Sequence, residues 1–297
     1  MATAGVVLVT GASSGIGRAT AALLARCGYT VFGTSRRPAA STLDGFTLIA
    51  LDVTDDESVA RCIETVIARA GRLDALVNNA GATLPGAVEE ITVEAARGLF
   101  ETNFFGAARM IRAALPYLRA SRGSIINMSS GFGLAGLPFD AYYSASKHAL
   151  EGLTESLRQE VTPLGVRVSL VEPGYFKSAL AGASRHAAPG LAVYQPRRDR
   201  ALALFDLSVN EGGDPVEVAQ AVRRLLAKRR PPLRTVVGRD ARLLSLGKRL
   251  TPYPLFVWGF RLFYGLDDWR AEARRALPVV AALAAGVLAM LRRRRQR

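Results

Sequence analysis

The chain has 297 residues, 49% of them hydrophobic, and a formal net charge of +14. A chain of this length can bury one sizeable core, and we expect one domain, residues 1–238, with an appendage at residues 239–297. Only two cysteines occur, which excludes a disulfide framework and a zinc-spaced cluster, so we expect no metal site. Positive charge gathers late in the chain without a nucleic-acid-binding motif, so we expect no nucleic-acid partner.

The N-terminal sequence predicts a cytoplasmic protein. The run Val6–Val9 reads as a strand and follows Met1 so closely that the charged and apolar regions of a secretory signal do not fit before it. The scarcity of cysteine also fits a reducing compartment.

Short β-branched runs alternate with amphipathic stretches, a pattern typical of βα units. The expected strands are Val6–Val9, Thr30–Gly33, Thr47–Leu51, Ala75–Val77, Ser124–Met128, Arg167–Val171 and Arg234–Val237. The expected helices are Gly17–Cys27, Glu57–Ala70, Ala95–Arg119, Tyr142–Thr162 and one from Asp214 to about Lys228. We therefore expect an α/β fold, a Rossmann-type doubly wound parallel sheet with helices on both faces and a ligand crevice at the carboxyl ends of the strands.

A substrate flap is expected at residues 175–213, after the sixth strand. Within it, Ser178–Ala201 is rich in Gly, Ala and Pro, which favours a mobile loop.

A glycine-rich turn joins the first strand to the first helix. Its small residues let the backbone approach a pyrophosphate at a helix N-terminus, which predicts nucleotide binding. A tight turn also needs glycine for steric reasons, so the turn alone leaves both interpretations open. The expected cofactor contacts in it are Thr10, Gly11, Ser13, Ser14, Gly15, Ile16 and Gly17.

The end of the second strand indicates which nicotinamide cofactor fits. An acidic residue about 20 residues past the glycines would accept the ribose hydroxyls of NAD, and Ser35 stands there instead. Arg36 and Arg37 follow it and can pair with a 2′-phosphate. We therefore expect NADP(H).

Two further strand ends add candidate cofactor contacts. Asp52, beside Val53, could accept from the adenine amino group or could cap the next helix. After the fourth strand, Asn79, Ala80 and Gly81 suit the floor of a cofactor site, although such a run is also an ordinary turn.

The candidate catalytic group is Ser130 with Tyr143 and Lys147. Tyr143 and Lys147 are four residues apart on a predicted helix, so both project from one face. A phenol with a pKa near ~10 is a poor base at neutral pH, but a neighbouring ammonium, aided by the positive nicotinamide of an oxidised cofactor, favours the phenolate. Ser130 can orient the substrate oxygen by a hydrogen bond. The spacing of Tyr143 and Lys147 alone also fits a surface pair without a catalytic role.

Together these motifs resemble the short-chain dehydrogenase/reductase family over about Val6 to Gly174. The shared motifs are the glycine turn Thr10–Gly17, the second signature Asn78–Gly81 and the Tyr-x-x-x-Lys pair of Tyr143 and Lys147. The resemblance implies that Ser130, thirteen residues before Tyr143, is the active serine. It further implies that Asn103 holds a water linking the lysine to solvent, and that Pro173 and Gly174 lie beside the nicotinamide.

The resemblance also bears on substrate and assembly. Gly131–Phe139 is similar to the branch of 17-beta-hydroxysteroid and retinol dehydrogenases, which implies a lipophilic alcohol, ketone or aldehyde of steroid, retinoid or fatty type. The family implies a homodimer or homotetramer formed through Ala95–Arg119 and Tyr142–Thr162. The alternatives are a non-catalytic NADP(H)-binding sensor or membrane scaffold, which needs none of the four catalytic candidates, and a nucleotide-sugar epimerase, which the glycine spacing disfavours.

The C-terminal sequence predicts contact with a membrane. Ala276–Leu291 contains no charged residue and precedes Arg292–Arg295. Its sixteen residues fall short of the roughly 20 that a membrane-spanning helix prefers, and the aromatic run from Tyr253 to Tyr264 favours an interface. We expect a shallow anchor or a marginal span, with peripheral contact at the cytoplasmic face of a membrane, or alternatively a cover over the substrate mouth or a subunit interface.

Overall fold

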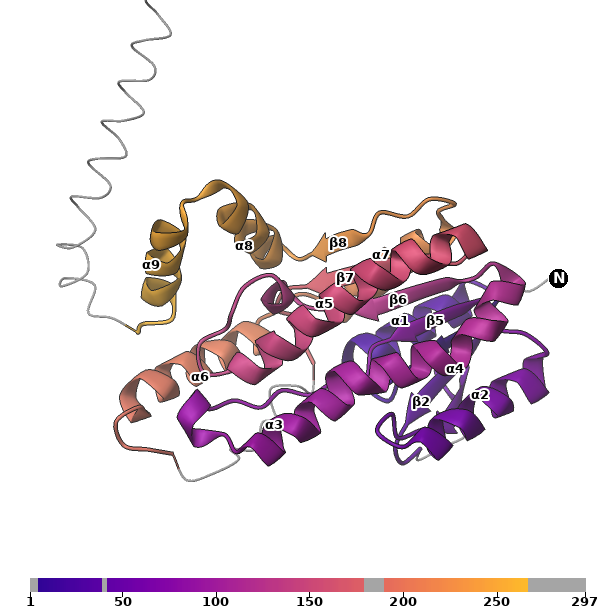
Figure 1. Cartoon of the computed structure of the whole chain (residues 1–297), viewed down its shortest axis with the longest axis horizontal. Helices are drawn as coiled ribbons and strands as arrows, with labels where there is room; N and C mark the ends of the chain where they lie inside the picture. The colour runs from indigo at the N-terminus through magenta and orange to yellow at the C-terminus, as the bar shows by residue number, and fades with distance from the viewer. Residues whose placement is uncertain (1–4, 39–41, 179–189, 267–297) are drawn as a thin grey trace, which may run out of the picture.

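The computed structural model describes residues 5–38, 42–178 and 190–266. Within them, one sheet of eight strands runs through the molecule in the order β3-β4-β2-β1-β5-β6-β7-β8 (Figure 1). Neighbouring strands are parallel except for the pair β3 and β4. The strands are β1 (Val6–Val9), β2 (Thr30–Ser35), β3 (Thr42–Leu43), β4 (Phe46–Ala50), β5 (Ala75–Asn78), β6 (Ser124–Met128), β7 (Arg167–Pro173) and β8 (Arg234–Val237).

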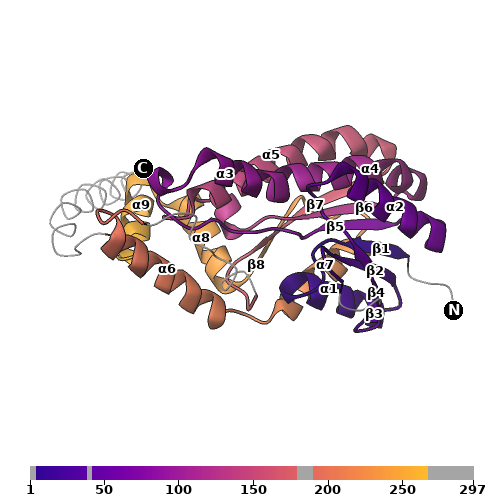
Figure 2. The same cartoon turned by 90° about the horizontal axis from the view of Figure 1, so that it is seen from below.

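Helices cover both faces of the sheet, as expected. Figure 2 shows α2, α4 and α5 along one face and α1 and α7 along the other. The α-helices are α1 (Gly15–Arg26), α2 (Asp56–Ala70), α3 (Val93–Phe100), α4 (Gly106–Ser121), α5 (Ala141–Val161), α6 (Gln195–Asn210), α7 (Pro215–Ala227), α8 (Arg239–Leu250) and α9 (Tyr253–Phe263). Shorter helical turns are η1 (Val88–Glu90), η2 (Glu101–Phe105), η3 (Gly131–Gly133) and η4 (Thr162–Leu164). The Rossmann-type fold is thereby confirmed.

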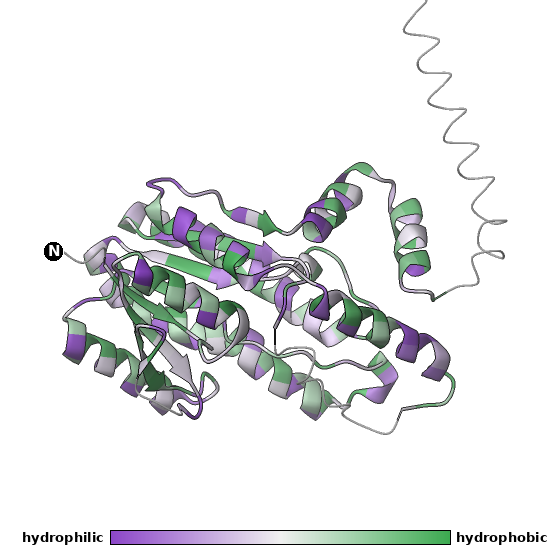
Figure 3. Cartoon of the chain, turned by 180° about the vertical axis from the view of Figure 1, so that it is seen from behind, coloured by the Kyte–Doolittle hydropathy of each residue, from purple (hydrophilic) through white to green (hydrophobic). Residues whose placement is uncertain are grey.

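Each face of the sheet has its own apolar core. Leu8 belongs to one buried cluster together with Met110 of α4, and its neighbour Val7 belongs to the opposite cluster with Leu24 of α1. Strands buried on both faces read as continuous apolar runs, because a parallel sheet is covered on both sides. Figure 3 accordingly shows mainly hydrophobic strands between helices of mixed character.

The order of the strands places a crevice between β1 and β5. The chain passes from β1 through β2 to β4 on one side of the sheet, then returns through β5, β6, β7 and β8 on the other side. At such a switch point the connections leave in opposite directions, so the carboxyl ends of the two strands stay open for a ligand. Thr10 follows β1 and Asn79 follows β5 at this point.

The predicted continuous helix Ala95–Arg119 is wrong. α3 ends at Phe100, a π-helical turn spans Glu101–Phe105, and α4 begins at Gly106. A π turn accommodates one extra residue, and such turns are frequent at functional sites. The stretches on either side remain amphipathic, so hydrophobic periodicity does not reveal the interruption.

The predicted loop Ser178–Ala201 is wrong over its last part, because α6 begins at Gln195. Pro196 stands in the first turn of α6, where its missing N–H costs nothing. Buried Arg198 pairs with Glu90 of η1 and so anchors this helix to the body of the protein. Residues 179–189 of the predicted loop lie outside the described residues.

The C-terminal appendage starts directly after β8 with α8 and α9. Asp240, in the first turn of α8, accepts a hydrogen bond of 2.6 Å from the backbone N of Tyr175. The apolar run Ala276–Leu291 and the arginines after it lie outside the described residues. Within residues 5–38, 42–178 and 190–266, no helix combines the length and apolar character needed to cross a bilayer.

Gly33 of β2 offers a test of the packing between the sheet and its cover. A Cβ at Gly33 would lie 2.5 Å from the Phe46 ring and 2.7 Å from the Ala12 Cβ. Gly33→Ala should therefore lower the free energy of unfolding by about 1–3 kcal/mol, because the core would be overpacked. Urea denaturation measures this, with Gly98→Ala in α3 as the control, since a Cβ at Gly98 meets no atom within 4 Å. Equal stability of the two variants would contradict this packing.

Candidate active site

A hydrogen-bonded clamp joins the glycine turn to the end of β5. Thr10 Oγ1 accepts from the backbone N atoms of Asn79 and Ala80, at 2.9 Å each. In return, Asn79 Nδ2 donates to the carbonyl oxygens of Thr10 and Gly11, at 2.9 and 3.1 Å. The structure therefore brings these four predicted residues together as one floor at the switch point of the sheet.

The first turn of α1 leaves backbone N–H groups without a side-chain cap. Ser14 is the N-cap residue but makes no capping hydrogen bond, and the first turn holds no acidic residue. Gly15 has a φ of 53°, which favours glycine. A Cβ at Gly17 would lie 2.2 Å from the carbonyl oxygen of Gly11, so only glycine lets the helix approach the turn this closely. Together with exposed Ser13, this helix N-terminus suits a phosphate group.

The ends of β2 and β4 carry the charged candidates. Ser35 ends β2, and Arg36 and Arg37 follow it as exposed residues. Asp52 Oδ1 accepts from the backbone N and the hydroxyl of Thr54, at 2.9 and 2.7 Å. These bonds, with a smaller contribution from Arg36, hold the pKa of Asp52 below its usual value. Asp52 is thus ionised close to Arg36, and the side chain of its neighbour Val53 lies in the core.

The three catalytic candidates meet beyond the carboxyl end of β6. Ser130 caps the short turn η3 and is hydrogen-bonded to the Tyr143 hydroxyl. Tyr143 and Lys147 lie one turn apart on α5. The Lys147 Nζ donates to the carbonyl oxygen of Met128 at 2.9 Å and lies 5.7 Å from the centre of the Tyr143 ring. Two separate elements, the end of a central strand and one face of a long helix, therefore hold the group in place.

Burial dominates the protonation of this group. It raises the pKa of Tyr143 to about 12, against the opposing effect of the hydrogen bond with Ser130. It also lowers the pKa of Lys147 to about 8. The expected lowering of the Tyr143 pKa is therefore not present in the protein alone. The physical reason is that the ammonium bonds to the Met128 carbonyl rather than to the phenol, so desolvation of the phenolate outweighs its attraction.

Asn103 lies in the π turn and is buried. Its Oδ1 accepts from the backbone N of Ala82 at 2.8 Å, and its Nδ2 donates to the Ala82 carbonyl at 2.9 Å and to Ser146 Oγ at 3.0 Å. A Cβ at Gly81 would lie 3.3 Å from Asn103 Oδ1 and 3.6 Å from Lys147 Nζ. The amide therefore fixes the chain after Gly81 beside Lys147, and its role toward a water molecule stays a prediction.

One cavity connects the nucleotide end with the catalytic group. Its lining includes the predicted residues Ile16, Asn79, Gly81, Ser130, Tyr143, Lys147, Pro173 and Gly174. The same lining includes aromatic side chains, among them Phe132, Tyr175 and Phe205. A ligand that occupies the glycine turn can therefore extend to the Tyr143 hydroxyl and meet an apolar compound there.

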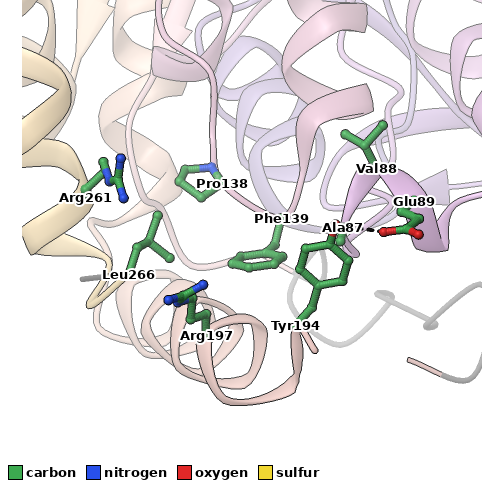
Figure 4. Close-up of a pocket in the computed structure, with 9 residues that line it drawn as sticks. All are labelled: Ala87, Val88, Glu89, Pro138, Phe139, Tyr194, Arg197, Arg261 and Leu266. Carbon is green, nitrogen blue, oxygen red and sulfur yellow. Dashed lines mark hydrogen bonds between the residues drawn. The ribbon is translucent and has the colours of Figure 1, made fainter. Parts of the chain in front are cut away.

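A second, open groove lies on the outer side of Phe139. Phe139 belongs to the aromatic cluster that includes Tyr143, and its ring centre lies 6.4 Å from that of Tyr194. Figure 4 shows Pro138, Phe139 and Leu266 along the groove, with Arg197 and Arg261 near one end and Glu89 at the other. The Tyr194 hydroxyl donates to Glu89 at 2.8 Å, which fixes that end. The groove thus adds an amphipathic surface next to the catalytic cavity.

Sequence reasoning missed two carboxylates that border the site. Asp140 is 3% exposed, accepts from the backbone N of Leu84 at 3.2 Å, and has its pKa raised to about 7 by burial. Its charge contributes to the raised pKa of Tyr143. Asp240 holds the backbone of Tyr175 from α8. An aspartate directly before a helix, as Asp140, or in its first turn, as Asp240, is an ordinary signal of a helix start, so the sequence contains nothing that distinguishes either residue.

Comparison with known proteins agrees with this geometry. A model of the short chain dehydrogenase family matches residues 5–189. The 3-ketodihydrosphingosine reductase of Bacteroides thetaiotaomicron is 37% identical, over 88% of this chain and 98% of that protein. Retinol dehydrogenase 8 of Homo sapiens is 39% identical, over 77% of this chain and 79% of that protein.

Solved structures show the same relationship. The crystal structure of a short-chain dehydrogenase from Streptomyces avermitilis is 37% identical, with a TM-score of 0.75, and the match covers 95% of this chain and 100% of that one. A short chain dehydrogenase from Burkholderia cenocepacia in complex with NADP is 28% identical, with a TM-score of 0.69, over 86% of this chain and 97% of that one. The family match spans more than half of the chain, and the chain therefore belongs to the short-chain dehydrogenase family of oxidoreductases.

Proposed function

We propose that this protein is an NADP(H)-dependent oxidoreductase that interconverts a lipophilic secondary alcohol and its ketone, or an aldehyde and its alcohol. The observation that carries the proposal is the single cavity in which Ser130, Tyr143 and Lys147 lie next to the glycine turn. The nicotinamide supplies or accepts the hydride when it is bound. The residues of the chain supply the proton and hold the substrate oxygen.

Tyr143 is the general acid and base of the proposed reaction. Its pKa of about 12 in the protein alone keeps the phenol protonated, so it can donate a proton to a carbonyl oxygen during reduction. Ser130 shares a hydrogen bond with the same hydroxyl, and it can hold the substrate oxygen beside it. In oxidation the phenol must first lose its proton, and a positive charge close to the ring lowers the cost of that loss.

Lys147 and Asn103 assist Tyr143 in the proposed reaction, Lys147 by its charge and Asn103 by its hydrogen bonds. The buried ammonium of Lys147 lies 5.7 Å from the centre of the phenol ring, where it favours the phenolate when that form appears. Asn103 binds the backbone N and carbonyl oxygen of Ala82, the residue after Gly81, and so fixes this segment of the chain. In the proposal it also positions a water that links Lys147 to solvent.

The residues around the glycine turn fit a dinucleotide. Uncapped N–H groups of α1 suit the pyrophosphate, and Asn79, Gly81, Pro173 and Gly174 line the way to Tyr143. Arg36 and Arg37 are exposed directly after β2, where a 2′-phosphate of NADP would be paired. In support, a relative of known structure is in complex with NADP.

A lipophilic substrate is supported by the walls of the cavity. Phe132, Phe205 and Val209 line the cavity that contains the catalytic group, and apolar pockets with few polar groups are typical of sites for such compounds. The relatives named for 3-ketodihydrosphingosine and for retinol support the same class. The amphipathic groove outside Phe139 offers room for the distal part of a long substrate.

The proposal places the protein at the cytoplasmic face of a membrane, as a homodimer or homotetramer. Exposed apolar side chains on α8 and α9 support membrane contact, among them Leu243, Leu250 and Tyr253, each at least 70% exposed. Phe105, at the start of α4, is 45% exposed and is available for a contact between subunits.

Tyr143→Phe should lower kcat by at least about 100-fold, because general acid–base catalysis contributes that much or more. NADPH oxidation is followed against a panel of long-chain ketones, retinoid aldehydes and ketosteroids, with NADH in parallel. Tyr142→Phe is the matched control, because Tyr142 is the neighbouring phenol on α5 and is five residues from Lys147. Cofactor binding without turnover of any substrate by the native protein would favour a sensor instead.

Replacing Arg36 and Arg37 by Gln together should raise the KM for NADPH and leave the KM for NADH nearly unchanged, because only NADPH carries the 2′-phosphate. A loss of about 10-fold or more in the preference for NADPH is expected, since charge-assisted hydrogen bonds contribute about 1.5–3 kcal/mol each. The double variant Arg223→Gln with Arg224→Gln, on α7, controls for the change in net charge. An unchanged ratio of the two KM values would show that the arginines do not select the cofactor.

A further inference from the structure

Tyr175 connects the catalytic cavity with the C-terminal helices. It follows Gly174 at the end of β7, and its ring lines the cavity that contains Ser130 and Tyr143. Its backbone N donates to Asp240 of α8 at 2.6 Å. Its hydroxyl lies 2.6 Å from the hydroxyl of Tyr264, the residue directly after α9. One residue is therefore held by both helices of the C-terminal appendage, through Asp240 in α8 and Tyr264 directly after α9.

The two phenols are enclosed by aromatic side chains. The Tyr175 ring makes edge contacts with Phe132 and Phe205, with ring centres 5.8 and 5.9 Å apart. Tyr264 is 2% exposed, and its ring lies 4.9 Å from that of Phe260. Burial raises the pKa values of both tyrosines, so both are protonated at neutral pH. Both hydroxyls thus remain hydrogen-bond donors among aromatic side chains, with the charge of Asp240 close enough to contribute to both raised pKa values.

The hydrogen bond between the two phenols leaves one hydroxyl hydrogen without a partner in the pair. Each hydroxyl carries one hydrogen, and the bond between them consumes one of the two. Tyr264 is buried and is not among the residues that line the cavity, whereas Tyr175 is. When Tyr264 donates to the Tyr175 oxygen, the hydrogen of the Tyr175 hydroxyl is left for a ligand in the cavity. Hydrogen bonds in such a chain polarise and strengthen each other.

We propose that Tyr175, oriented by Tyr264, is a polar subsite that binds a second oxygen function of the substrate, apart from the oxygen held by Ser130 and Tyr143. This inference rests on the proposed function and narrows its substrate class. The substrate is a lipophilic carbonyl compound or alcohol that carries a further hydroxyl or carbonyl oxygen near the reacting carbon. Its remaining surface is apolar and contacts Phe132 and Phe205.

A structural role alone does not account for the two hydroxyls of Tyr175 and Tyr264. Phenylalanine at both positions would keep the same ring contacts and would avoid placing two hydroxyls in an apolar surrounding, where an unsatisfied one costs about 1–3 kcal/mol. A substrate that lacks the second oxygen leaves the Tyr175 hydrogen unused. A site built around a hydroxyl in this way discriminates against the analogue that lacks the partner group.

The test uses the full chain and ligands that differ by one oxygen. A long-chain ketone is compared with its α-hydroxy and β-hydroxy analogues of equal length. Dissociation constants are measured by calorimetry with NADP⁺ present, which cannot reduce the ketone, and NADPH absorbance is followed in the same samples to exclude oxidation of the added hydroxyl. The ratio kcat/KM is measured separately with NADPH. The variants are Tyr175→Phe, Tyr264→Phe and the double variant. Tyr253→Phe is the control, because Tyr253 lies at the start of α9 and is 73% exposed.

The native protein should bind one of the hydroxyketones about 3- to 10-fold more tightly than the plain ketone, which is the usual range for one hydrogen bond. Tyr175→Phe should remove this preference and leave the affinity for the plain ketone nearly unchanged. Tyr264→Phe should remove part of the preference for the hydroxyketone. The double variant should show the same affinities as Tyr175→Phe. Tyr253→Phe should match the native protein.

Several outcomes overturn the inference. One is a native protein without preference for either hydroxyketone, and another is a Tyr175→Phe variant that weakens all ketones by the same factor. Turnover of ketones without any such preference leaves the proposed function standing and removes the subsite. A preference in binding that depends on Tyr175, without turnover of any ketone, supports the subsite and removes the proposed function. Absence of any binding overturns both.

Discussion

The shielding of Tyr143 and Lys147 from water is the constraint on which the site depends, with Lys147 5% exposed and Tyr143 partly buried against the aromatic cluster. A shielded phenol resists ionisation and a buried ammonium binds its proton less tightly, and the pKa values of about 12 and about 8 express these two costs. These desolvation costs are offset because charges interact more strongly where water is excluded. The arrangement therefore keeps the proton on Tyr143 until another positive charge or a substrate oxygen enters the cavity.

The fold supplies the supports that this constraint requires. Lys147 is held by the carbonyl of Met128 at the end of β6, and Tyr143 by Ser130 directly beyond that strand. The clamp between Thr10 and Asn79 fixes the neighbouring strand ends at the switch point of the sheet. Since these elements come from different parts of the chain, the site exists only when the sheet is complete.

Much of the fold and of the site follows from local sequence. Runs such as Val6–Val9 predict buried strands, and the spacing of Tyr143 and Lys147 predicts a shared helix face, because both depend only on the period of the element. The interruption of the helix at Asn103 and the start of α6 at Gln195 could not be predicted in this way. They depend on tertiary partners, namely Ala82 for Asn103 and Glu90 for Arg198 of α6. The hydroxyl pair of Tyr175 and Tyr264 is equally hidden, because its members are 89 residues apart.

The most direct test of this account is the ionisation of Tyr143 with and without an oxidised cofactor. Tyrosinate absorbance is titrated for the native protein and for Tyr143→Phe, and the difference between the two curves reports Tyr143 alone. The midpoint should lie well above pH 10 in the protein alone, because burial raises the pKa of Tyr143 above the free phenol value of about 10. NADP⁺ should lower it by at least about one unit, because its positive nicotinamide favours the phenolate. A midpoint near neutral pH without cofactor, or one that NADP⁺ does not move, would show that shielding from water does not control the ionisation of Tyr143.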